Sequence, residues 1–240
     1  MTSSLFLGFL AVVALSLAAL CARYLPRRAT AVVFIALPVW LLYVGLLSYF
    51  GVVRNPALRP PGIAYILLPV FLFAFLFAIR SPAGARVARA IPLWALLAFQ
   101  VYRVGVELFL HELWREGLTP RMVTFNGANF DMLIGASAPV IAWLASRGRL
   151  EMRLALTWNA LGLLSLANVA TRSALTAPGP LHLLHSEVPN LAIGTFPYTF
   201  IPGFFAPLAV VLHIFAIRSL RQRLSGNLPR RAGTQKVVAV

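Results

Sequence analysis

Charged residues are scarce in this 240-residue chain and make up 11% of it, whereas soluble domains contain about 25%. The chain has a single cysteine, Cys21, which excludes an intrachain disulfide, a CxxC redox pair and a thiolate metal site. Its single lysine, Lys236, lies in the polar C-terminal tail, so a retinal Schiff base within a helical bundle is excluded as well. These shortages argue against a soluble enzyme, a disordered protein and a secreted disulfide scaffold.

The chain is rich in long apolar stretches. Hydrophobic residues make up 60% of it, and its mean hydropathy is +0.84. A helix crosses a bilayer with about 20 apolar residues and satisfies its own backbone there. The sequence therefore predicts an all-α polytopic membrane protein with seven transmembrane helices in residues 1–220. The expected spans are 4–22, 30–51, 62–79, 89–113, 132–147, 153–172 and 199–217.

Basic residues outnumber acidic ones, with 21 Lys and Arg against 6 Asp and Glu. Fifteen basic residues fall on one side of the expected helices and five on the other, while Arg103 lies inside a span. Because cytoplasmic connectors are enriched in Lys and Arg, we expect the N-terminus outside and the C-terminus in the cytoplasm. No Lys or Arg precedes the first apolar stretch, which favours a retained helix over a signal peptide.

The same bias bears on the expected partners. A net charge of +15 on a soluble chain would suggest nucleic acid, but the cytoplasmic connectors of a membrane protein explain it here, so no nucleic-acid partner is expected. Residues 221–240 are predicted to form a basic cytoplasmic tail, which would contact anionic lipid. The bilayer is the first expected partner, and a small ligand or ion is the second.

The fourth expected span carries an unusual polar stripe formed by Gln100, Arg103, Glu107 and His111. Their spacings of 3, 4 and 4 place them on one face of a helix, with Arg103 near the middle of the bilayer. A charge at that depth costs about 2.5–3.5 kcal/mol on insertion scales, so Arg103 and Glu107 are expected to pair. Two interpretations stay open: a structural ion pair, or a site for a ligand, ion or proton.

The sixth expected span carries a second stripe that includes Ser165, Asn168 and Arg172, at a depth comparable with the first. Gly162 lies on the same face and permits close helix approach. We therefore expect the fourth and sixth spans to face each other around a polar cavity that opens outward. The alternative is that these side chains only form interhelical hydrogen bonds.

A metal site is a further alternative. Glu107, His111, Asp131, His182 and His185 supply carboxylates and imidazoles suited to zinc or iron. The spacing of these residues is loose, however, and Asp131 or Asn129 is also well placed to cap the fifth span. His182 and His185 lie in the second of two long outer connectors, 114–131 and 173–198, the kind of segment that often forms a lid or a binding loop.

Three motifs follow one another between Phe99 and Ala142: Gln-x-x-Arg-x-x-x-Glu from Gln100, Thr-Phe-x-Gly-x-Asn-Phe-Asp from Thr124, and Gly-x-x-Ala-Pro from Gly135. This stretch resembles a family of uncharacterised bacterial integral membrane proteins. The last span and the segment from Trp158 to Leu163 are similar to the same family. Val123 and Tyr198 depart from its pattern, which has Met and Phe there. The resemblance implies a multi-span protein of the bacterial inner membrane and brings no activity with it.

The function expected from these observations is that of an inner-membrane protein with an outward-facing intramembrane pocket for a small ligand or ion, in a sensor or transport-like role. The expected ligand-binding residues are Gln100, Arg103, Glu107, His111, Asp131, Ser165, Asn168 and Arg172. The alternatives are a membrane-embedded, metal-assisted hydrolase and a structural or assembly protein. The sequence leans away from an enzyme, because no Ser/His/Asp motif or nucleophile elbow is visible in it.

Overall fold

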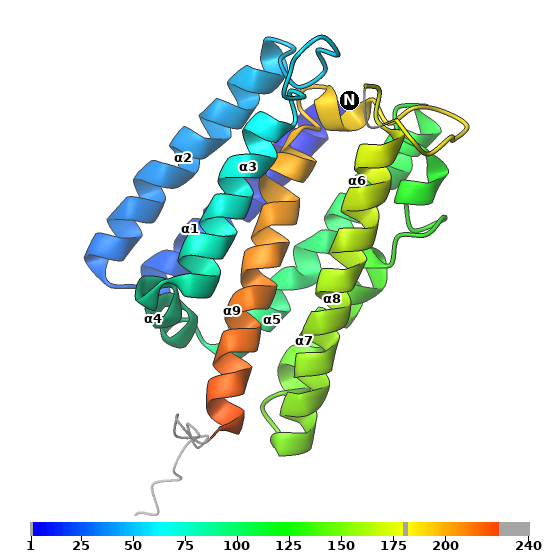
Figure 1. The fold of residues 1–240 in the computed structure, drawn as a ribbon. Helices are drawn as coiled ribbons and strands as arrows, with labels where there is room; N and C mark the ends of the chain where they lie inside the picture. Colours follow the sequence, from blue (N-terminus) through cyan, green and yellow to red (C-terminus); the bar gives the residue numbers. More distant parts are fainter. Residues whose placement is uncertain (1, 180–181, 226–240) are drawn as a thin grey trace, which may run out of the picture.

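The computed structural model describes residues 2–179 and 182–225, of which 76% are helical and none lies in a strand. The helices form a bundle (Figure 1). In chain order the elements are α1 (Thr2–Tyr24), α2 (Arg27–Tyr49), α3 (Ala64–Leu72), the π-helix η1 (Phe73–Arg80), α4 (Pro82–Ala90), α5 (Leu93–Ala98), the 3-10 helix η2 (Phe99–Val101), α6 (Tyr102–Arg115), the 3-10 helix η3 (Arg121–Val123), α7 (Asp131–Leu144), α8 (Arg149–Thr176), the 3-10 helix η4 (Ala192–Gly194), the π-helix η5 (Ile201–Phe205) and α9 (Ala206–Leu224).

Five helical stretches are long and apolar enough to cross a membrane. They are Thr2–Tyr24, Arg27–Tyr49, Leu93–Arg115, Leu150–Thr176 and Ile201–Leu224. A sixth is added if Ala64–Arg80 and Pro82–Ala90, which meet at an angle of 76°, count as one bent span. These helices indicate a membrane protein built as an all-α bundle.

The fifth expected span, 132–147, differs most from its prediction. It corresponds to α7, which has 14 residues and at about 1.5 Å per residue is shorter than the hydrocarbon core of about 30 Å. The chain before α7 is folded against the bundle, since Val123, Thr124 and Asn129 are buried. Non-helical backbone at membrane depth is tolerated where protein covers it, so this segment can extend the reach of α7.

Prolines set the ends of α4 and correct the expected start of the fourth span at residue 89. Ser81 and Ile91 both have extended backbone and precede Pro82 and Pro92, as expected because proline disfavours the helical conformation in the residue before it. The Ser81 hydroxyl also caps α4 by accepting from the Gly84 N–H at 2.8 Å. Residues 89 and 90 therefore belong to the short helix α4, and the next helix begins at Leu93.

The C-terminal boundary is also shifted, because α9 continues to Leu224 and includes the first residues of the expected tail. The rest of that tail, 226–240, lies outside the described residues. α9 packs against α4, α5 and α8, and α7 packs against both α6 and α8. The middle of α9 and the N-terminus of α7 are thereby placed beside the polar stripe of α6.

Candidate functional site

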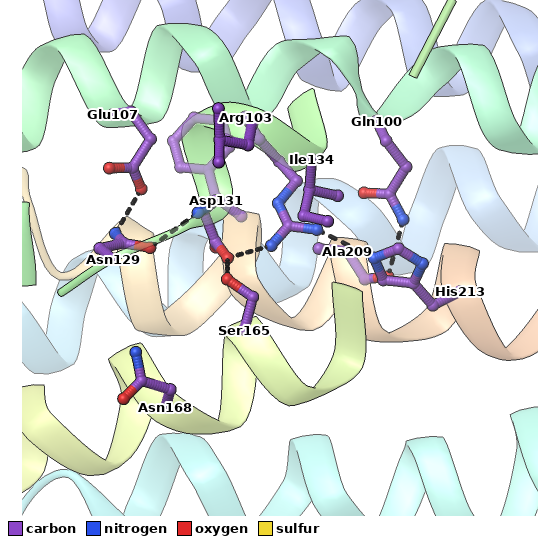
Figure 2. A network of polar contacts seen from close by, with 12 residues as sticks. Gln100, Arg103, Glu107, Asn129, Asp131, Ile134, Ser165, Asn168, Ala209 and His213 are labelled. Atoms are coloured by element: carbon purple, nitrogen blue, oxygen red, sulfur yellow. Dashed lines mark hydrogen bonds and ion pairs between the residues drawn. The ribbon is translucent and has the colours of Figure 1, made fainter. Parts of the chain in front are cut away.

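Arg103 lies at the centre of a buried polar network (Figure 2). It is 2% exposed, at the middle of the Leu93–Arg115 stretch. Its guanidinium forms an ion pair with Asp131, the first residue of α7, and its Nη1 lies 2.9 Å from Nε2 of His213 on α9. The expected pairing of Arg103 with Glu107 is therefore wrong: the N-terminus of α7 enters the bundle and supplies the carboxylate instead.

The contacts of His213 fix which of its nitrogens carries the proton. A guanidinium has only donors, so Nε2 of His213 accepts from Arg103. The other nitrogen, Nδ1, lies 2.8 Å from Oδ1 of Asn159 on α8 and donates to it. The Asn159 amide in turn donates to the Ala155 carbonyl at 2.7 Å. The donors thus all point the same way along this chain, and His213 is neutral in it.

Gly162 allows His213 to reach this position. A Cβ at Gly162 would lie 2.3 Å from Cε1 of the imidazole, closer than side chains can approach. The prediction that Gly162 permits close helix approach thus applies to α9, which packs against α8 here. The ring of His213 occupies the space that a side chain on α8 would fill.

Glu107 lies one turn from Arg103 and has a neutral partner. Nδ2 of Asn129 donates to Oε1 of Glu107 at 2.6 Å, and Oδ1 of Asn129 accepts from the Asp131 N–H at 3.0 Å. Asn129 therefore links the two acidic residues. The N-cap position of α7 is occupied by Phe130, which forms no side-chain cap, so neither Asn129 nor Asp131 caps this helix as expected. The second oxygen of Glu107, Oε2, has no hydrogen-bond partner among the described residues.

The stripe on α8 reaches the segment before α7 and the start of α7. The Ser165 hydroxyl donates to Asp131, while Nδ2 of Asn168 donates to the Ala128 carbonyl at 2.6 Å. Arg172 donates from Nε to Oδ1 of Asn168 at 2.9 Å. The two stripes thus meet through Asp131 and the segment before it, and the expectation that the fourth and sixth spans face each other directly needs this correction.

Gln100 and His111 have polar contacts with residues other than Arg103. Gln100 is buried and donates to the Ala209 carbonyl of α9 at 3.2 Å. His111 stacks on Phe125, with ring centroids 4.9 Å apart, and contacts Asn126. His111 is therefore a neighbour of the connector 114–131 and takes no part in the ionic network.

The expected metal ligands are dispersed. His182 and His185 are paired with each other, with ring centroids 6.0 Å apart, and Glu107 and Asp131 face Asn129 and Arg103. Within residues 2–179 and 182–225, no group of three or more His, Cys, Asp or Glu side chains is arranged to hold a metal ion. The structure thus does not bring together Glu107, His111, Asp131, His182 and His185, the residues of the alternative zinc or iron site.

A cavity of about 760 Å³ adjoins the network. Arg103, Glu107 and Asp131 contribute to its wall, and most of the remaining wall is apolar and comes from α3, α8, η5 and α9. The connectors 53–63 and 190–195 border it as well. In Figure 1, α3 and α8 lie on either side of α9. The volume falls in the range of about 300–1,000 Å³ that is usual for small-molecule sites.

Three members of the network were missed as site residues: Asn129, Asn159 and His213. The cost of placing a polar group in lipid applies to Asn159 and His213 as it does to Arg103, so their position inside apolar spans was a usable signal. Asn129 gave no such signal, because it lies in a connector whose path into the bundle is set by tertiary packing.

Taken together, these features define a helical membrane protein with a buried ionic network beside an amphipathic cavity. The chain belongs to the family of a domain of unknown function, DUF8737, whose sequence model matches residues 60–221. This match agrees with the resemblance to an uncharacterised family, and it contains every residue of the network. A comparison with curated proteins and one with solved structures found no match.

Proposed function

We propose that this protein binds a small amphipathic molecule within the membrane, in the cavity beside Arg103, Glu107 and Asp131. One observation carries the proposal: ionisable groups of a buried network form part of the wall of a mainly apolar cavity. An apolar chain would pack against α3, α8 and α9, and a polar group would meet the network. A sensor or transport-like role is consistent with such a site.

The cavity distinguishes this proposal from a purely structural role. A network that only holds helices together would have its polar atoms satisfied and enclosed, because an unpaired polar atom in a low-dielectric interior is costly. Here the carboxylate of Glu107 borders the cavity and its Oε2 has no partner among the described residues. A bound molecule would supply the missing contact.

The proposal includes a topology with seven passes, the N-terminus outside and the C-terminus in the cytoplasm of a bacterial cell. α7 would complete the seventh pass together with the buried segment before it. The α1–α2 connection, the α7–α8 connection and the end of α9 are rich in arginine and lie at one end of the bundle (Figure 1). The connectors that border the cavity lie at the other end. The positive-inside rule therefore favours a cavity nearer the outer surface.

Cysteine labelling tests this topology. Ala57→Cys and Ser225→Cys, each in a Cys21→Ala background, place single thiols at opposite ends of the bundle. A membrane-impermeant maleimide applied to intact cells is expected to label position 57 and to spare position 225 until the cells are lysed. Labelling of position 225 from outside would contradict the orientation.

Native mass spectrometry of the detergent-extracted protein tests the binding function. The wild-type protein is expected to retain a small amphipathic molecule, and Ala170→Trp, which fills the cavity from α8, is expected to lose it. Leu164→Trp is the matched control, because Leu164 is exposed on the same helix and does not line the cavity. Equal occupancy in all three proteins, or none in the wild type, would argue against the proposed site and for a structural role.

A further inference from the structure

The charges beside the cavity do not balance. Arg103 contributes one positive charge, Asp131 and Glu107 contribute one negative charge each when ionised, and His213 is neutral because it accepts from Arg103. The ionised cluster thus carries one net negative charge. In a buried site an uncompensated charge is strongly unfavourable, so the cluster needs one positive charge, which either a proton on Glu107 or a cationic ligand supplies.

The contacts show where that charge is missing. Both terminal nitrogens of the Arg103 guanidinium are engaged, one with Asp131 and the other with His213. Asp131 is matched by this ion pair and by the Ser165 hydroxyl. Glu107, by contrast, has a single neutral partner, Asn129.

The free oxygen of Glu107 is buried, and the side chain that carries it borders the cavity. The Glu107 side chain is 1% exposed and lines the cavity wall, and Oε2 lacks a hydrogen-bond partner among the described residues. A carboxylate oxygen only accepts hydrogen bonds. The group that completes this site must therefore be a donor, and a positively charged donor would also balance the cluster.

Nε of Arg103 also lacks a partner among the described residues, which raises the opposite possibility of an anionic ligand. An anion there would face two carboxylates with only one guanidinium between them, and the net charge would become more negative. Arg54 lies in the cavity wall but is exposed, where solvent screens its charge. The charge balance at depth thus favours a cation.

We infer that the cavity selects an amphipathic amine, with its ammonium group on Glu107 and its apolar chain against side chains such as Val70, Leu166 and Ile201. This inference rests on the proposed function and names the ligand class of the same site. The ammonium donates to Oε2 of Glu107, while the Asn129 contact holds Oε1 in place. Arg103 and Asp131 then act as a neutral pair that positions the cluster.

Three probes with the same chain and different head groups test the inference: dodecylammonium, dodecanol and dodecanoate. Their dissociation constants are obtained from concentration-dependent shifts in the melting temperature of the full-length protein in a nonionic detergent. Dodecylammonium is expected to bind the wild-type protein at least about tenfold more tightly than the other two, since hydrogen bonds to charged groups contribute about 1.5–3 kcal/mol.

Matched variants test the preference for an amine separately from binding in the cavity. Glu107→Gln keeps the shape of the side chain and is expected to remove the preference for the amine. Glu112→Gln changes a partly exposed acid on the same helix and is expected to preserve the preference. Ala170→Trp is expected to weaken binding of all three probes, while Leu164→Trp leaves it unchanged.

The outcomes differ for the ligand class and for the binding function. Tighter binding of dodecanoate or dodecanol, blocked by Ala170→Trp, would overturn the amine and leave the cavity function in place. A Glu107-dependent shift of the same size with sodium chloride alone would overturn the amine in favour of a bare ion. No binding of any probe to the wild-type protein would count against the proposed function itself.

Discussion

The N-terminal helix pair and the central helices of the bundle differ in how much of their apolar surface is buried within the protein. Only 6% of the apolar stretch of α2 is buried within the protein, against 61% of that of Ile201–Leu224. The network residues Arg103, Glu107, Asp131 and His213 all lie on the central helices. Apolar side chains tolerate lipid, whereas charged ones must be covered by protein. The helices that carry the polar network are therefore the more deeply buried ones.

The family match reinforces this comparison, because it covers residues 60–221 and excludes α1 and α2. The excluded helices are still connected to the centre by specific contacts. The Trp40 indole donates to the Gly203 carbonyl at 2.7 Å, and the Ser48 hydroxyl lies 2.7 Å from that of Thr199. We therefore expect substitutions in the two regions to differ sharply in effect.

The largest effect is expected for Asp131→Ala. Removing this carboxylate leaves Arg103 buried and without its ionic partner, which costs about 3–5 kcal/mol for a buried pair. Folded yield and melting temperature in detergent should fall strongly. Glu112→Ala is the control, since its pair with Arg115 is exposed and contributes under about 1 kcal/mol. Similar losses for both variants would mean that water reaches Arg103.

The same substitution, glycine to alanine, can be compared in the two regions at Gly162 and Gly8. Gly162→Ala is expected to destabilise the protein by about 1–3 kcal/mol, the usual range for overpacking, because the new Cβ meets the ring of His213. Gly8→Ala on α1 meets nothing within 4 Å and should be neutral or slightly stabilising. Thermal unfolding of both variants measures the difference.

A second test checks that the Gly162 effect acts through His213. In a His213→Ala background the same Gly162→Ala substitution should cost much less, because the added methyl group then has space. An unchanged cost in that double-mutant cycle would show that the backbone of α9 limits the approach, and not the imidazole.

The smallest effect is expected for Leu42→Ala on α2. Leu42 is exposed on the surface of the bundle, and substitutions away from packed or bonded features usually change stability by no more than about 0.5 kcal/mol. The melting temperature and extracted yield should match those of the wild-type protein. A marked loss would reveal that this face of α2 packs against another protein chain.

The sequence predicted the depth of the polar groups better than their partners. Helical periodicity placed Gln100, Arg103 and Glu107 on one buried face of the bundle, and all three are buried. It also suggested Glu107 as the partner of Arg103, because residues four apart are neighbours on a helix. The true partner, Asp131, lies 28 positions away and depends on how the chain before α7 folds, which no local pattern encodes.

The same reasoning explains why the span count differed. Hydropathy reads apolar composition, and residues 132–147 are apolar, but helix α7 begins at an acid and ends at Leu144. The chain before α7 is folded into the bundle and contains buried polar side chains such as Thr124 and Asn129. A hydropathy profile treats these residues as an outer connector, so the entry of this segment into the bundle could not be predicted.

The order of donors around His213 has a consequence for proton leakage through the membrane. An arginine guanidinium does not release its proton at physiological pH, and the Asn159 amide on the other side of the ring donates onward to a backbone carbonyl. The chain from Arg103 through His213 to Asn159 therefore holds its hydrogens in place. This part of the network thus holds a charge inside the bundle without offering a relay along which a proton could pass.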